Sequence, residues 1–216
     1  MTKRRLRKAL RQYPDWPEKG VLFEDIMPIF ASHQLHSDLI KALEMQIKQA
    51  YEGTKLPDVI VGLESRGFLF GPSLALRLGA SFVPVRKQGK LPGPTETEGF
   101  QKEYGKDYFQ IQQDAIQKGQ SVIVVDDIMA TGGSAAAAGS LVKKIGGNLI
   151  GYVFLMELEF LKGREKLDAP VHTLLTGQES KDTPDEKLPL GRTKEAAEET
   201  RKSVKDAGGA AAETRP

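Results

Sequence analysis

The 216-residue sequence contains no cysteine, which excludes a disulfide framework, a thiol nucleophile and a zinc–thiolate site. No apolar run approaches the roughly 20 residues that a membrane-spanning helix requires, so we expect no membrane partner. The chain has only three histidines, and their spacing is not that of metal ligands. A formal net charge of +2 does not support a dedicated nucleic-acid binder, whose basic residues dominate one face.

The most informative stretch runs from Ser121 to Leu141 and reads SVIVVDDIMATGGSAAAAGSL. It begins with a β-branched apolar run over 122–125, which predicts a strand buried on both faces of a parallel sheet. We expect this strand to end at two adjacent carboxylates, Asp126 and Asp127. A loop of small residues and an alanine-rich helix follow; the loop consists of Ala130, Thr131, Gly132, Gly133 and Ser134.

This strand–loop–helix unit predicts a phosphate-binding turn. Paired glycines let the backbone approach a ligand, and the free N–H groups at a helix start attract an anion. The alternative is an ordinary turn in which Ser134 caps the helix. Like charges at Asp126 and Asp127 are costly at the end of a buried strand unless a diol, a metal or solvent meets them, which favours the functional interpretation.

Other segments predict an α/β fold with a doubly wound, mainly parallel sheet flanked by helices. Apolar residues recur every three or four positions over 33–51, as in an amphipathic helix. The apolar run 58–63 predicts a strand that leads through a polar turn into a helix over 68–78. Further strands are expected at 81–85, 148–158 and 170–176, and a short helix at 160–167.

Two polar turns follow the predicted strands. Glu64, Ser65 and Arg66 offer backbone amides and a guanidinium that suit a pyrophosphate, although a helix cap with a surface ion pair is the alternative. Three cations, Arg86, Lys87 and Lys90, surround one bend and form either a pyrophosphate clamp or a solvated face. The segment 91–102 has little apolar patterning and predicts a long loop that is functional or disordered.

Residues 122–134 resemble the signature of the type I phosphoribosyltransferases, in which apolar residues precede two acids and a T-G-G-S/T loop. Neither the P-loop ending nor a G-x-G-x-x-G motif is present. The resemblance implies that the loop from Ala130 to Ser134 holds a ribose 5-phosphate. It also implies that Asp126 and Asp127 contact the ribose hydroxyls.

Further segments resemble the adenine phosphoribosyltransferases of this family, in the same order along the chain. The segment 13–26 resembles the hood over the base, which implies that Phe23 stacks on the purine and that the Leu22 backbone touches its edge. The resemblance also implies a cis peptide bond between Glu64 and Ser65. The pyrophosphate-binding residues that it implies are Glu64, Ser65, Arg66, Arg86, Lys87, Lys90 and Tyr104.

The sequence E-Y-G-K from Glu103 to Lys106 resembles the end of the family's catalytic lid. The resemblance implies that Glu103 is the general acid or base that exchanges a proton with N7 of the base. It also implies catalytic roles for Tyr104, which closes over the pyrophosphate, and for Arg66.

The resemblance implies an enzyme of purine salvage that transfers the 5-phosphoribosyl group of phosphoribosyl pyrophosphate to adenine, giving AMP and pyrophosphate. It implies Mg²⁺, held mainly by substrate oxygens and water, with no protein ligand identified. It further implies a cytoplasmic homodimer. The alternatives are transfer to another purine base, a non-catalytic regulator that binds phosphoribosyl pyrophosphate, and an inactive paralogue.

We expect one phosphoribosyltransferase domain over 1–178, with an N-terminal helix and hood over 1–32 and a lid loop over 86–107. Residues 179–216 have no aromatic side chain and many charges, which predicts a disordered tail. The basic N-terminus is typical either of a transit peptide or of a solvated helix face; we expect the helix, with inward-facing apolar residues Leu6, Ala9, Leu10 and Tyr13.

Overall fold

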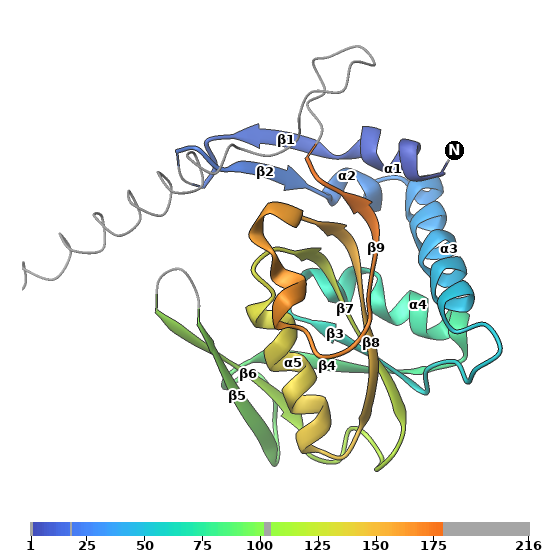
Figure 1. Ribbon diagram of the computed structural model, residues 1–216, viewed down its shortest axis with the longest axis vertical. Coiled ribbons are helices and arrows are strands. Elements are labelled where there is room, and N and C mark those ends of the chain that lie inside the picture. The colour runs from blue at the N-terminus through green and yellow to red at the C-terminus, as the bar shows by residue number, and fades with distance from the viewer. Residues whose placement is uncertain (1, 18, 102–104, 179–216) are drawn as a thin grey trace, which may run out of the picture.

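A computed structural model describes residues 2–17, 19–101 and 105–178 (Figure 1). Its centre is a seven-stranded sheet in the order β5-β6-β4-β3-β7-β8-β9. Five neighbouring strands are parallel: β4 (Ser81–Lys87), β3 (Val59–Leu63), β7 (Ser121–Met129), β8 (Asn148–Glu157) and β9 (Val171–Thr176). The predicted α/β fold with a mainly parallel sheet is confirmed. The predicted tail, 179–216, lies outside the described residues.

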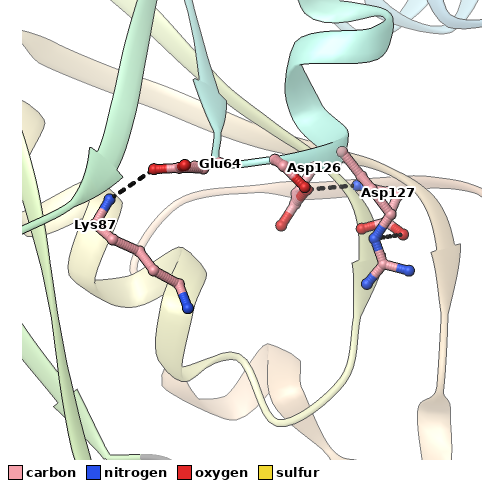
Figure 2. A pocket seen from close by; sticks show the side chains of 6 residues that line it. Glu64, Lys87, Asp126 and Asp127 are labelled. Carbon is pink, nitrogen blue, oxygen red and sulfur yellow. Dashed lines mark hydrogen bonds and ion pairs between the residues drawn. The ribbon is translucent and has the colours of Figure 1, made fainter. Parts of the chain in front are cut away.

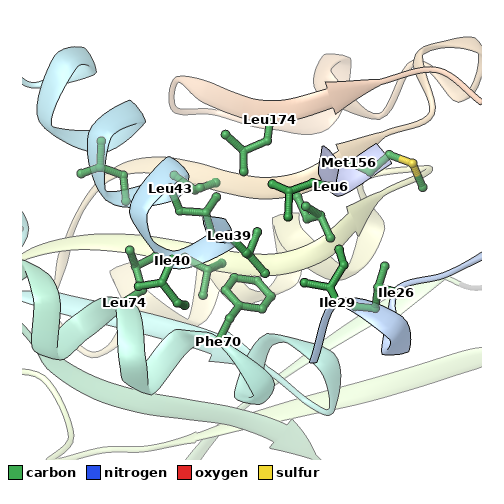
Figure 3. Close-up of a cluster of buried hydrophobic side chains, with 14 of the residues drawn as sticks. Leu6, Ile26, Ile29, Leu39, Ile40, Leu43, Phe70, Leu74, Met156 and Leu174 are labelled. Atoms are coloured by element: carbon green, nitrogen blue, oxygen red, sulfur yellow. The ribbon is translucent and has the colours of Figure 1, made fainter. Parts of the chain in front are cut away.

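Helices cover both faces of the sheet (Figure 1). Four helices share one apolar cluster with one face, and Figure 3 shows side chains of that cluster packed together. Of the α-helices in the described residues, one packs on the opposite face. The first group comprises α1 (Thr2–Ala9), α2 (Met27–Phe30), α3 (His33–Ala50) and α4 (Gly71–Leu78), and the opposite helix is α5 (Gly133–Lys144).

Alternation along the central strands divides the core into its two clusters. Ile60 and Ile123 face α3 and α4, whereas Val61 and Val124 face α5, and all four are fully buried. Successive side chains on a strand point to opposite faces, so a continuous apolar run is required where both faces are covered. The apolar run over 122–125 therefore formed the strand that its composition predicts.

The register of the parallel strands brings polar residues together at one edge of the sheet. Leu63 is paired with Val85 and Gly62 with Val125. The next residues along these strands are Glu64, Arg86 and Asp126. They consequently lie side by side at the carboxyl ends of β3, β4 and β7, where ligands bind in open α/β sheets.

The N-terminal segment packs on the domain in two parts. Leu6 and Leu10 are buried against α3, as predicted, and Ala9 is partly buried. Tyr13 is 44% exposed, so the prediction that it packs inward is wrong. The helix ends at Ala9, and Tyr13 lies instead on β1 (Arg11–Pro14), which forms an antiparallel hairpin with β2 (Leu22–Asp25). Helical periodicity therefore no longer applies at Tyr13.

The segment that the sequence predicts as a long loop contains a strand. β5 (Thr95–Gln101) pairs along its whole length with β6 (Lys106–Gln112) in an antiparallel hairpin that joins the sheet through β4. Phe100 is the buried apolar residue of β5, and its ring lies 4.6 Å from that of Phe109. A single buried residue gives the sequence no alternating apolar pattern from which this strand could be predicted. The strand forms because its backbone pairs with β6.

Two other boundaries differ from the prediction. β7 continues through both aspartates to Met129, because β8 pairs with it along that length. The short helix predicted over 160–167 is replaced by two 3₁₀ turns, η2 (Glu159–Leu161) and η3 (Gly163–Lys166). A third 3₁₀ turn, η1 (Arg66–Leu69), precedes α4. Among the described residues, no helix is long and apolar enough to cross a membrane.

Truncation of Leu39 in α3 tests the core packing. Leu39 is fully buried, so we expect Leu39→Ala to lower the free energy of unfolding by about 2–5 kcal/mol through lost burial and the cavity left behind. Met45 on the same helix is 61% exposed, and we expect Met45→Ala to change stability by no more than about 0.5 kcal/mol. Urea unfolding followed by circular dichroism measures both. Equal losses for the two variants would contradict this assignment of the core.

Candidate active site

An open pocket of about 400 Å³ lies at the carboxyl ends of β3, β4 and β7. All of its lining residues were predicted from the sequence as site residues: Glu64, Ser65, Arg66, Lys87, Asp126 and Asp127. Figure 2 shows Lys87 and Asp127 on opposite sides of this pocket, with Asp126 between them. The pocket is therefore lined by carboxylates and cations together, as a site for a polar, highly charged ligand requires.

The two adjacent aspartates differ in burial because they occupy successive positions on β7. Asp127 is 3% exposed, whereas Asp126 is half-buried and opens on the pocket. The backbone N–H of Asp127 donates to Oδ1 of Asp126 at 2.9 Å. Oδ2 of Asp127 lies 3.0 Å from Nε of Arg66, which comes from the turn after β3. Arg66 thus supplies the positive charge next to the more buried acid.

Burial acts on both carboxyls of this acidic pair, and repulsion from Asp127 acts on Asp126. Burial raises the pKa of Asp126 well above its usual range, and the neighbouring Asp127 raises it further. Burial also raises the pKa of Asp127, although the Arg66 guanidinium opposes that rise. Ionisation of both carboxyls is therefore unfavourable in the ligand-free pocket and becomes favourable when additional positive charge enters it.

Glu64 has a different environment from the aspartates. Its carboxylate lies 3.1 Å from Nη2 of Arg86 and accepts a 3.0 Å hydrogen bond from the backbone N–H of Lys87. The hydrogen bond from Arg86 holds the pKa of Glu64 below its ordinary value. Glu64 is thus an ionised anchor that holds the end of β4, and the peptide bond that joins it to Ser65 is cis, as the family resemblance implies.

The three predicted cations have different positions. Lys87 lines the pocket, and its Nζ lies 3.5 Å from Oδ2 of Asp107 on β6. Arg86 donates to the carbonyl of Lys90 at 3.0 Å as well as pairing with Glu64. Within the described part of the chain, neither Arg86 nor Lys90 belongs to the pocket lining. Their predicted contact with pyrophosphate stays a prediction, while Arg86 here organises the turn that carries Lys87.

The loop from Ala130 to Ser134 leads directly into α5. Gly132 is the N-cap, with a left-handed φ of 77°, and the helix begins at Gly133. The alternative in which Ser134 caps the helix is therefore wrong. Because no side chain caps this helix, the N–H groups of its first turn remain available for an anion beside the acidic pair.

The β1–β2 hairpin brings an aromatic pair close to the charged residues. The Trp16 and Phe23 rings lie 4.3 Å apart in an edge-to-face arrangement. The Arg66 guanidinium lies 5.8 Å from the centre of the Phe23 ring. Arg66 therefore connects the predicted base-stacking residue with Asp127, which places the predicted base and ribose sites next to each other.

Two residues of this region were missed by sequence reasoning. Trp16 contacts Phe23, and its status as the single tryptophan of the chain was a usable signal. Gln178 donates from its side-chain amide to the Leu22 carbonyl at 2.6 Å. No signal in the sequence indicates that contact, because 156 positions separate the two residues.

Glu103 and Tyr104, the predicted lid residues, lie outside the described residues. The hairpin that carries them does reach the site: a Cβ on Gly133 would lie 3.4 Å from the Gln101 carbonyl oxygen. Lys144 and Ser140 on α5 also contact Glu98 of β5, at 2.9 Å and 2.7 Å. The end of β5 is therefore held beside the start of α5.

Within residues 2–17, 19–101 and 105–178, no three or more His, Cys, Asp or Glu side chains form a group that could hold a metal ion. Asp126 and Asp127 are the carboxylates of the pocket that are not used to anchor β4. Such a donor set suits Mg²⁺, which commonly binds one or two carboxylates and completes its shell with substrate oxygens and water.

Comparison with known proteins identifies relatives over most of the chain. A sequence profile of the phosphoribosyl transferase domain matches residues 30–185. The adenine phosphoribosyltransferase of Yarrowia lipolytica is 62% identical over 174 residues, covering 81% of this chain and 95% of that protein. The Candida albicans adenine phosphoribosyltransferase is 58% identical over 178 residues, covering 82% and 92% of the two chains.

The fold is similar to solved structures of the same group. The Saccharomyces cerevisiae adenine phosphoribosyltransferase, complexed with D-2,5-dideoxy-2,5-imino-altritol 1,6-bisphosphate and adenine, superposes with a TM-score of 0.79. It is 57% identical in sequence and covers 81% of this chain and 98% of that one.

Neutralising Asp126 tests the electrostatics of the acidic pair. We expect Asp126→Asn to raise the melting temperature of the ligand-free protein at pH 7, because Asn keeps an acceptor for the Asp127 N–H and removes a charge whose pKa is raised by burial. An acid whose pKa is higher in the folded than in the unfolded protein lowers the stability of the fold as pH rises from the ordinary pKa towards the raised one. The stabilisation should therefore shrink as pH falls and vanish below 3.8, the ordinary pKa of this group.

Asp58→Asn is a matched control for which we expect the opposite change in melting temperature. Hydrogen bonds from Lys55 and Ser121 lower the pKa of Asp58 to about 2, so its ionised form stabilises the fold above pH 3.8 and loses that effect as pH falls towards 2. Asp58→Asn should lower the melting temperature at pH 7. Melting curves by differential scanning calorimetry between pH 3 and 8 measure both variants, and a loss of stability in Asp126→Asn at pH 7 would contradict our account.

Proposed function

This chain belongs to the phosphoribosyl transferase family, as one of its adenine phosphoribosyltransferases, and from that premise we propose how its pocket carries out the reaction. The reaction transfers the 5-phosphoribosyl group of phosphoribosyl pyrophosphate to adenine and gives AMP and pyrophosphate, a step of purine salvage. The observation that carries our assignment is that Asp126 and Asp127 line one pocket together with the cations Arg66 and Lys87.

The ribose 5-phosphate binds at the loop from Ala130 to Ser134. The uncapped first turn of α5 offers backbone N–H groups to a phosphate, and the helix dipole favours its charge. The hydroxyl groups of Thr131 and Ser134 add donors at the same loop. The ribose then lies between this loop and the acidic pair on the preceding strand, so that its hydroxyl groups contact Asp126 and Asp127.

The pyrophosphate binds on the opposite side of the pocket, against Lys87, Arg66 and the backbone of Glu64 and Ser65. Lys87 is held there by the hydrogen bond from its backbone N–H to Glu64 and by its side-chain contact with Asp107. Tyr104 and the cations Arg86 and Lys90 complete the site. Positive side chains at this position stabilise the negative charge that accumulates on pyrophosphate as it leaves.

Asp126 and Asp127 stabilise the transition state more than the ground state. As the bond to pyrophosphate breaks, positive charge develops on the ribose near C1. Burial makes ionisation of the pair unfavourable in the free protein, as the raised pKa values indicate. A positive charge that appears beside them makes their ionised forms more favourable. This is the differential stabilisation that lowers a reaction barrier.

Adenine binds next to Arg66, under the β1–β2 hairpin. Phe23 stacks on the purine, with the Trp16 ring edge-on to Phe23, and the Leu22 backbone meets the adenine edge. The Gln178 amide, which donates to the Leu22 carbonyl, fixes that segment. Glu103 accepts the proton that leaves N7 as N9 attacks C1 of the ribose and the bond from C1 to pyrophosphate breaks.

Mg²⁺ is part of the proposal. Asp126 and Asp127 are the pocket carboxylates that would meet it, and substrate oxygens with water would complete its coordination. When bound, the ion supplies positive charge that neutralises the pyrophosphate. We further propose that the protein is a homodimer in the cytoplasm, for which the family resemblance is the support; sedimentation and cell fractionation test these two points.

The experiment for the function offers adenine, hypoxanthine, guanine and xanthine in parallel, with phosphoribosyl pyrophosphate and Mg²⁺. We expect formation of AMP and pyrophosphate from adenine alone, because the hood residues Phe23 and Leu22 match those of the adenine enzymes. Turnover of another base would contradict our assignment of the base site while retaining the catalytic residues. Binding of phosphoribosyl pyrophosphate without turnover of any base would indicate a regulator or an inactive paralogue.

Replacement of the proposed general acid or base tests the mechanism. We expect Glu103→Gln to lower kcat by about 100-fold or more, the usual contribution of a positioned proton-transfer group, while KM values stay near those of the parent protein. Glu96 lies on the same hairpin, where Gln113 donates to it at 2.8 Å, so Glu96→Gln is the control and should retain full activity. Steady-state kinetics that give Glu103→Gln an unchanged kcat would remove Glu103 from the mechanism.

A further inference from the structure

We infer that Gly163, which lies outside the pocket lining, is a positioning residue for the phosphate-binding loop. It follows Lys162 at the start of η3, after β8, and its backbone packs directly on the backbone of the loop from Ala130 to Gly132. The inference rests on the proposed function, in which that loop holds the 5-phosphate of the substrate.

The contact between Gly163 and the loop leaves no space for a side chain on either side. A Cβ on Gly163 would lie 2.3 Å from the Ala130 carbonyl oxygen and 2.9 Å from the Gly132 nitrogen. Conversely, a Cβ on Gly132 would lie 2.3 Å from the Gly163 carbonyl oxygen. All these neighbours are backbone atoms, so a change of rotamer cannot relieve the clash. Two segments separated by about thirty residues are therefore packed backbone against backbone, a proximity that only glycine permits.

The segment that contains Gly163 is firmly attached to the sheet. Arg164 donates from Nε and Nη2 to both oxygens of Glu157, at 2.7 Å and 2.6 Å, and from Nη1 to the Val171 carbonyl at 2.8 Å. Glu157 is only 4% exposed, whereas the Arg164 side chain is 46% exposed, so this two-pronged ion pair is buried on its carboxylate side. The pair fixes η3 to β8 and β9 and makes it a rigid support behind the loop.

The start of the phosphate loop is attached to the same region. Leu158 donates its backbone N–H to the carbonyl of Met129, at 2.9 Å, and Met129 is paired with Glu157. Ala130, the next residue, is then in contact with Gly163. The loop is consequently held at its start by β8 and at its back by η3. A displacement of Gly163 has to move the loop amides.

Gly163 is suited to a test by substitution because its own backbone accepts alanine. Its φ lies outside the left-handed range, unlike that of Gly132. The three atoms nearest to the added methyl group all belong to the loop. Gly151 provides a matched control, since a Cβ there would lie 2.2 Å from Oη of Tyr51 and 3.1 Å from the Pro170 carbonyl. Gly151 is near the start of β8, at the end opposite the pocket.

The experiment measures the dissociation constant of ribose 5-phosphate by calorimetry, and the KM values of phosphoribosyl pyrophosphate and adenine, for the parent protein, Gly163→Ala and Gly151→Ala. We expect Gly163→Ala to weaken ribose 5-phosphate binding and raise the KM of phosphoribosyl pyrophosphate about tenfold, since misplacement by about 1 Å can cost about 100-fold. The KM of adenine should change less than about twofold, within the scatter expected of a residue that does not touch the base. Gly151→Ala should lower the melting temperature without changing either constant.

An unchanged dissociation constant for ribose 5-phosphate in Gly163→Ala would overturn the inference, and so would equal losses for both substrates or in both variants. Failure of the parent protein to bind ribose 5-phosphate or to turn over adenine would instead refute the proposed function. If Gly163→Ala does not fold, Arg164→Lys decides the question. Lysine keeps the charge beside Glu157 but lacks the two-pronged donor. It should weaken ribose 5-phosphate binding several-fold, and an unchanged constant in that variant would also overturn the inference.

Discussion

The burial of two neighbouring carboxylates on a central strand is the constraint on which the pocket depends. Asp126 and Asp127 occupy the last part of β7, where burial raises the pKa of both. Arg66 meets Asp127 at 3.0 Å and leaves Asp126 open to the pocket. A protein selected for stability alone would have apolar residues here. In the proposed mechanism, the ligand brings positive charge next to this unfavourable pair during the reaction.

Cationic and anionic side chains surround that pair, and charged groups remain at the pocket surface. Glu64 engages Arg86 and the Lys87 backbone, so the β4 end is held in place and the Lys87 side chain is directed to the pocket. Arg66 contacts both Asp127 and the Phe23 ring. One guanidinium therefore couples the proposed base site to the acidic pair, and the sheet edge carries the proposed sites for base, ribose and pyrophosphate side by side.

Backbone packing completes the arrangement at the proposed phosphate site. The loop before α5 has no capping side chain, so its geometry depends on what supports it from behind. The η3 segment, anchored by Arg164 to buried Glu157, is in direct contact with Ala130 and Gly132. A phosphate site made of backbone amides is only as well positioned as its backbone. A rigid support outside the pocket is therefore as relevant to binding as the residues that line it.

The sequence by itself determined the elements whose signal is local. The apolar run over 122–125 requires burial on both faces, and the six residues that line the pocket come shortly after the apolar parts of β3, β4 and β7. The tertiary structure decided what depends on distant partners. β5 forms because β6 pairs with it. Tyr13 is exposed because its segment pairs with β2 as a strand and does not continue the helix. Glu64 pairs with Arg86 because the register of β3 and β4 aligns them. The contact of Gly163 with Ala130 has no local signal, because close packing of two backbones depends on the fold and not on the pattern of either segment.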